Sequence, residues 1–146
     1  MAAGYPDLFA FLGKLSDKLD ELTEIQKDKT LAVRRDDLMG VDACMKKEQA
    51  ISLSLRSMEQ QRLKLLRELG LDSVPLSALE RHCPPEQRQA ASEAAGRLRS
   101  SYEIYRSAAD VSRSTLEVNL HQIEQIIDAE TRSEASGGSH MADIRA

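Results

Sequence analysis

The chain has 146 residues, of which 41% are hydrophobic and 30% charged, and its formal net charge is −4. This length suits one domain, and the 3% aromatic content without tryptophan favours helices packed along their lengths over a compact enzyme pocket. Four prolines and seven glycines are too few for strands joined by frequent tight turns. The whole net charge lies in residues 100–146, which contain eight acidic and four basic residues, and this excess of negative charge argues against nucleic acid as a partner.

The first predicted helix begins near Pro6 and Asp7, because proline suits the first turn of a helix and an acid complements its positive end. Leucines then recur at spacings of four and three residues, which is a heptad seam, at Leu8, Leu12, Leu15, Leu19 and Leu22. A charged group follows the seam and predicts a turn into the next helix near Arg34.

Residues 36–70 predict a second long helix with one buried apolar stripe on an otherwise solvated surface. Asp36 and Asp37 are candidate N-terminal caps, and Gly70 stands where a left-handed residue often closes a helix. The stripe passes, mostly at spacings of three or four residues, through Leu38, Val41, Met45, Ile51, Leu55, Met58, Leu65, Leu66 and Leu69. Six acids balance six bases in this segment, which indicates a scaffold.

A short helical insert is expected after Gly70, opened by Ser73 and Pro75 and ended by Pro84 and Pro85. The two adjacent prolines also start the last helix, because the proline ring fixes φ at a value that a helix accepts in its first turn. This insert separates the second long helix from the third.

The third long helix is predicted from Glu86 to about Glu130, where no proline occurs, and would span roughly 65 Å at about 1.5 Å per residue. Ser112 and Asn119 fall in its apolar stripe and would cost stability if buried without partners. The expected fold is all-α: an elongated antiparallel bundle of three long helices with a short helical insert between the second and the third.

The expected organisation is a single helical-bundle domain over residues 1–132 and a polar tail over residues 133–146. Residues 138–141 read Gly-Ser-His-Met, a sequence that cloning vectors often leave behind, so the tail does not enter the fold argument.

The cysteines and the apolar runs predict a soluble protein of the reducing cytoplasm. Cys44 and Cys83 show no metal-ligand spacing. Residues 1–12 do not join a basic region to an apolar run, and no segment approaches about 18 consecutive apolar residues. Membrane insertion is therefore not expected.

Two groups of residues are candidates for chemistry. His82 stands beside Cys83, but adjacent side chains diverge in a helix or turn, so this pair is a weak nucleophile candidate. Glu117, His121 and Glu124 share one helical face and could hold a metal, yet no second helix carries a matching motif, and a solvated acidic face is the favoured interpretation. We therefore predict a protein that is not an enzyme, without catalytic residues, metal or cofactor.

The second half of the third helix carries an apolar strip whose flanks are acidic. The candidate partner-binding residues are Leu116, Asn119, Leu120, Ile123, Ile126 and Ile127. Burial in the core of the bundle is the first explanation of this strip, and pairing with a partner helix is the second. The acids beside the strip, which concentrate charge there, support partner binding.

Residues in the second helix carry a family pattern. They comprise the cluster Met45-Lys46-Lys47-Glu48-Gln49-Ala50, then Leu55 and Glu59, the step Arg62-x-x-Leu65-Leu66 and the ending Leu69-Gly70. This block resembles flagellar export chaperones of the FlgN type. A first helix with a heptad seam, a short helical insert and a long last helix are similar to that family's architecture over roughly residues 5 to 130.

The resemblance implies a cytoplasmic chaperone that binds the terminal amphipathic helices of hook-filament junction proteins. It implies that the chaperone prevents premature assembly of these proteins and delivers them to the flagellar type III export apparatus, and that the C-terminal part of the last helix makes the contact. The alternative is a structural coiled-coil adaptor or homodimer without an export role, and a homo-oligomer is a candidate in either case.

Overall fold

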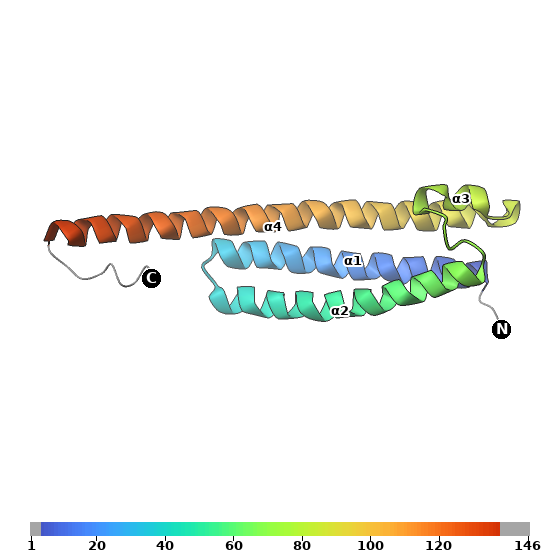
Figure 1. The fold of residues 1–146 in the computed structure, drawn as a ribbon, viewed down its shortest axis with the longest axis horizontal. Coiled ribbons are helices and arrows are strands. Elements are labelled where there is room, and N and C mark those ends of the chain that lie inside the picture. Colours follow the sequence, from blue (N-terminus) through green and yellow to red (C-terminus); the bar gives the residue numbers. More distant parts are fainter. Residues whose placement is uncertain (1–3, 138–146) are drawn as a thin grey trace.

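The computed structural model describes residues 4–137, and in that range the chain is helical, without strands. The elements are α1 (Tyr5–Arg34), α2 (Leu38–Glu68), the insert formed by η1 (Leu76–Ala78), α3 (Leu79–His82) and η2 (Pro85–Gln87), and α4 (Arg88–Gly137) (Figure 1). The predicted all-α class, with three long helices and a short insert, is confirmed. The Gly-Ser-His-Met sequence lies outside the described residues.

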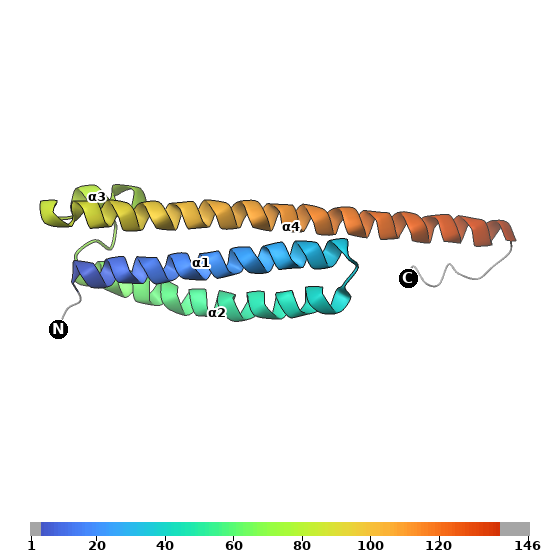
Figure 2. The same ribbon diagram turned by 180° about the vertical axis from the view of Figure 1, so that it is seen from behind.

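Helix α1 lies between α2 and α4, and both views show this order (Figures 1 and 2). Consecutive long helices run antiparallel, so α1 and α4 run parallel to each other. Helix α1 packs along both neighbours, whereas α2 and α4 make almost no direct contact within residues 4–137. The position of α4 therefore depends mainly on α1.

Gly70 closes α2 as the sequence predicts. Its φ of 72° is left-handed, a conformation that glycine adopts without strain. The N–H of Leu71 donates to the carbonyl oxygen of Leu66 at 2.8 Å, and both side chains are buried, so the chain turns sharply into the insert. This turn brings the insert onto the end of the bundle.

The two aspartates between α1 and α2 have different roles. Asp36 ends α1 in a left-handed conformation with φ 54°, so it is not the N-terminal cap of α2. The cap is Asp37, whose Oδ1 accepts a hydrogen bond from the N–H of Gly40 at 2.9 Å. A side chain on Gly40 would collide with Asp37 and crowd Ala32 of α1, so glycine permits the close approach of the two helices.

The hydrophobic core lies at the insert end of the bundle. Its buried members come from all three long helices and the insert: Leu8, Phe11, Leu12, Leu15, Leu66, Leu71, Leu79, Cys83 and Ala91. The heptad seam of α1 supplies three of these nine residues, Leu8, Leu12 and Leu15. The predicted stripe on α2 is only partly buried, because Leu66 is covered while Leu38 is 80% exposed and Met45 is also exposed at the far end of the hairpin. The expectation of a continuously buried stripe was therefore wrong.

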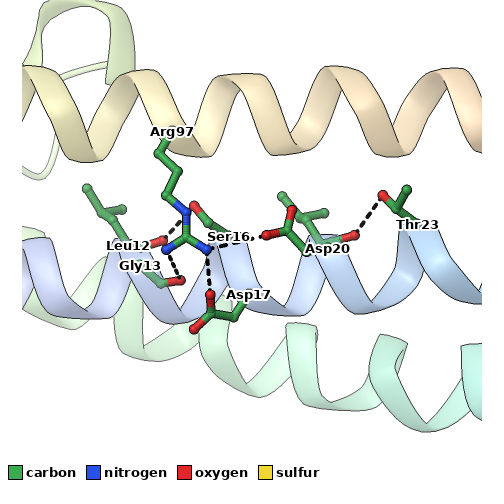
Figure 3. Close-up of polar contacts among 8 residues, drawn as sticks. Leu12, Gly13, Ser16, Asp17, Asp20, Thr23 and Arg97 are labelled. Atoms are coloured by element: carbon green, nitrogen blue, oxygen red, sulfur yellow. Dashed lines mark hydrogen bonds and ion pairs between the residues drawn. The ribbon is translucent and has the colours of Figure 1, made fainter.

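Small hydroxyl side chains line the contact between α1 and α4. Ser16, Thr23 and Thr30 recur every seven residues, are buried, and donate to the carbonyl oxygens four residues earlier at 3.0 to 3.1 Å. Figure 3 shows Ser16 and Thr23 pointing toward α4. Because each hydroxyl is satisfied inside α1, α4 needs no matching polar group and can approach closely with buried Ser101 and Ser112.

Arg97 links α4 to α1 on the solvent-exposed side of this contact. Its guanidinium on α4 donates to Asp17 at 2.5 Å, to Asp20 at 3.3 Å and to the carbonyl oxygen of Gly13 at 3.4 Å, all on α1 (Figure 3). The hydrogen bond to Asp17 raises the pKa of Arg97 above its ordinary value. These exposed bonds define the parallel register of the two helices more than they stabilise it.

Ser112 tests the cost of an unpaired hydroxyl in this contact. Its side chain is 1% exposed, and its Oγ has no hydrogen-bond partner among residues 4–137. Ser112→Ala is expected to raise the free energy of unfolding, measured with urea, by about 1 kcal/mol beyond the gain from helix propensity. Ser114→Ala, at an exposed position of the same helix, measures that propensity gain alone. Equal gains from both variants would contradict the prediction.

Candidate functional site

Helix α4 extends well beyond the hairpin formed by α1 and α2. The side-chain amide of Asn119 donates to Asp36 Oδ1 at 3.3 Å, so this point of α4 lies at the turn between α1 and α2. Beyond it, α4 projects past the other helices (Figures 1 and 2). We call residues 120–137 the projecting segment; at about 1.5 Å per residue they extend roughly 27 Å.

The predicted strip lies at the base and along the first half of the projecting segment. Its large apolar side chains are mostly open to solvent: Leu120 is 51% exposed, Ile123 45% and Ile126 59%. Leu116 is exposed as well, and Ile127 is half-buried. No other helix within residues 4–137 covers the strip, so the core does not account for it.

The six predicted residues form one surface but do not contribute equally. Leu116, Leu120, Ile123 and Ile127 follow at spacings of four, three and four residues and share a face of the helix. Asn119 and Ile126, seven residues apart, lie on the adjacent side of the helix. Because the amide of Asn119 is already bonded to Asp36, Asn119 serves as the anchor of the segment, and the apolar surface comes from the other five.

A further apolar pair lies at the tip of the α1–α2 hairpin. Leu38 and Met39 begin α2, two and three residues after Asp36, and Met39 is 86% exposed. The pair follows Asp36, which contacts Asn119, but it begins α2, which lies on the other side of α1 from α4 (Figure 1). The sequence interpretation missed this pair because Leu38 fits the helical stripe, whose period does not reveal where the neighbouring helix ends.

The surroundings of the strip are acidic. From residue 117 to residue 135 the chain carries five acids and one base. Within the described residues, no group of three or more His, Cys, Asp or Glu side chains could hold a metal ion, so Glu117, His121 and Glu124 do not form such a cluster. The negative charge therefore surrounds an exposed apolar surface.

The cysteine candidates lie in packed surroundings. Cys83 belongs to the hydrophobic core, and Cys44 is buried against the α1–α2 interface region. Burial raises the pKa of both thiols, partly opposed by Arg88 at Cys83 and reinforced by Asp28 at Cys44. Since the thiolate is the nucleophile, neither environment activates a cysteine. None of the helices in the described part of the chain is long and apolar enough to cross a membrane.

A groove runs along one side of the contact between α1 and α4, and we call it the α1/α4 groove. It has a volume of about 670 Å³, and its apolar lining includes Leu31, Ile104 and Val111, all exposed. A continuation of similar size reaches Val118. Ile104, Val111 and Val118 recur at intervals of seven residues. A search for apolar residues three or four positions apart does not find this stripe.

Comparison with known proteins gives one match. A family model described as FlgN protein matches residues 1–140. No curated protein and no solved structure matches the chain.

The buried thiols predict low reactivity in the folded protein. Reaction of the native protein with a disulfide reagent at pH 8 is expected to be at least about 100-fold slower than reaction in denaturant, because the thiols are shielded and their raised pKa reduces the thiolate fraction. Cys44→Ser and Cys83→Ser variants, followed by absorbance, separate the two rates. A fast native reaction at Cys83 would contradict its place in the core.

Proposed function

The chain belongs to the FlgN family of flagellar export chaperones, and from that membership we propose that it binds hook-filament junction proteins in the cytoplasm. By binding them it prevents their premature assembly, and it delivers them to the flagellar type III export apparatus. The observation that supports this function best is the projecting segment, which exposes isoleucine and leucine side chains along its helix. Exposed apolar surface of this kind is typical of interaction sites.

The proposed contact is helix against helix. A terminal amphipathic helix of the client, which would otherwise pair with neighbouring subunits, lies along Leu116, Leu120, Ile123 and Ile127 with its own apolar face. Burial of about 600 Å² of apolar surface is worth roughly 15 kcal/mol gross at about 25 cal/mol per Å². Much of this is offset by the cost of ordering the client, so the complex can be released at the export apparatus.

The charges beside the strip favour one kind of client helix. Glu117 and Glu124 lie along the strip, and the projecting segment carries a single arginine, so lysines and arginines on the rim of the client helix complement it. This attraction speeds association more than it strengthens the complex. Added salt therefore slows association of the client without abolishing binding.

The anchor between Asn119 and Asp36 explains how a free helix remains positioned. The bond fixes the base of the segment on the α1–α2 turn, while the core at the opposite end supplies the stability of the protein. Client binding therefore does not require the bundle to open.

The strip can be disrupted without touching the core. Ile123→Asp combined with Ile126→Asp is expected to abolish capture of terminal segments of junction proteins in a pull-down, because each change places a charge in the proposed interface. Circular dichroism is expected to show an unchanged helical content and melting temperature, since neither side chain is buried.

His121→Asp combined with Gln125→Asp is the matched control, because it places two aspartates in the same segment on exposed positions outside the strip. The control is expected to retain binding. If the isoleucine variant unfolds, the strip is part of the core and the proposed binding site is wrong; if both variants lose binding, added charge rather than the strip is responsible.

Hydrogen exchange gives a second test. Amides of residues 120–137 are expected to exchange at least about 100-fold faster than those of residues 91–112, because residues 91–112 pack on α1 and residues 120–137 do not. A bound client is expected to slow exchange in residues 116–127. Protection of that region in the free chaperone, measured by mass spectrometry, would show that the strip is already covered.

A further inference from the structure

Part of the strip belongs to a longer row of apolar residues that begins in the supported part of α4. We call this row the α4 column; its members recur every seven residues and are Ala95, Tyr102, Ala109, Leu116 and Ile123. Ala95 is only 7% exposed, whereas Tyr102 is 51%, Leu116 37% and Ile123 45% exposed, and Ala109 is half-buried. The column is therefore covered at the core end of the bundle and largely open from Tyr102 onward.

The α4 column and the α1/α4 groove lie on different sides of the contact with α1. Ser112 is buried in that contact. At about 100° per residue, Ile104 of the groove lies about 80° to one side of Ser112, and Tyr102 lies about 80° to the other side. Helix α2 makes almost no contact with α4 within residues 4–137, so on the side of Tyr102 no second long helix packs along α4.

Arginines flank the open half of the column that lies before the strip. Arg99, Arg106 and Arg113 also recur every seven residues, and all three are exposed. Each lies on the side of the column that faces away from α1. Arg113 forms an exposed ion pair with Asp110 at 2.6 Å, and within the described residues Arg99 and Arg106 form none.

The charge beside the column therefore changes sign along α4. Glu103 and Asp110 lie farther round the helix than the arginines and line the α1/α4 groove and its continuation. Beyond Arg113 the flanking charges are Glu117 and Glu124, beside the strip. One apolar face thus has a basic rim in its first half and an acidic rim in its second.

We propose that the client helix follows the α4 column back to Tyr102, so that its binding surface covers residues 102–127. This inference rests on the proposed function, which places the client on Leu116 and Ile123. The client class is an amphipathic helix of about 26 residues, roughly 39 Å long, with an acidic rim in one half and a basic rim in the other. The acidic half lies beside the arginines.

Continuity assigns this surface to the client. Leu116 and Ile123 belong both to the strip and to the α4 column, so a helix that packs along them meets Ala109 and Tyr102 when it continues toward the core. The small side chain of Ala109 permits close approach, and Tyr102 offers a large apolar ring whose hydroxyl can stay in water. The contact grows from about three helical turns to about seven.

Photo-crosslinking of the full chain tests the path of the client. Benzoylphenylalanine is placed singly at Tyr102, Ile104 or Leu120, and the probes are labelled terminal segments of junction proteins. Tyr102 and Ile104 are matched, because they are 51% and 54% exposed and lie on different sides of α4. The probe is expected to crosslink at positions 120 and 102, and at least about tenfold less at position 104.

The position within the strip separates this inference from the proposed function. Crosslinking at position 120 without crosslinking at position 102 would overturn the longer path and leave the strip as the client site. Equal yields at positions 102 and 104 would also overturn it, because the client would then not follow one side of α4. A probe that does not crosslink at position 120 would contradict the proposed client site, and the longer path would fail with it.

Charge reversal tests the acidic half of the client. Arg99→Glu combined with Arg106→Glu is expected to weaken binding of the same segments, measured by fluorescence anisotropy, by at least about tenfold, because attraction becomes repulsion. Lys14→Glu combined with Lys64→Glu is the control, since it makes the same change of net charge at exposed positions on α1 and α2. The control is expected to bind like the wild type. An arginine variant with unchanged affinity, or an equal loss in both variants, would overturn the proposed acidic rim.

Discussion

The parallel contact between α1 and α4 is the constraint on which the rest of the structure depends. Helix α4 barely touches α2 within the described residues, so α1 alone holds it over most of the supported length. On the α1 side this contact is lined by Ser16, Thr23 and Thr30, whose hydroxyls bond to their own helix, so that the two helices lie close without a large apolar interface there. As a result, large apolar residues of α4 are free to face outward, on both sides of this contact.

The buried core and the exposed apolar strip lie at opposite ends of the molecule. Large leucines and the insert close a core at one end, and the other end carries a single helix with exposed isoleucines and acidic flanks. A client bound along the strip, as proposed, would change no contact in the core. This division matches the charge distribution, because the segments that form the core are neutral overall and the excess acid belongs to the last part of the chain.

Much of the fold could be predicted because local signals dominate it. Gly70, Asp37 and the paired prolines define the ends of elements through backbone geometry alone, and the heptad seam of α1 identifies the core face. The exposure of Leu38 could not be predicted, since helical periodicity is blind to where a neighbouring helix stops. The candidate strip was visible as a pattern, but only the lengths of α1 and α2 reveal that nothing in the described bundle covers it. The α1/α4 groove was not predicted from the sequence, because the apolar residues that line it on α4 recur only every seven residues.

The chain order of the helices has a consequence for synthesis. Helices α1 and α2 precede α4, and their hairpin, closed by the turn at Asp36 and Asp37, can form while α4 is still being made. The exposed isoleucines belong to the last part of α4, so they leave the ribosome only when the platform that anchors Asn119 is ready. The stretch most prone to unwanted association is thereby exposed for the shortest time before its support exists.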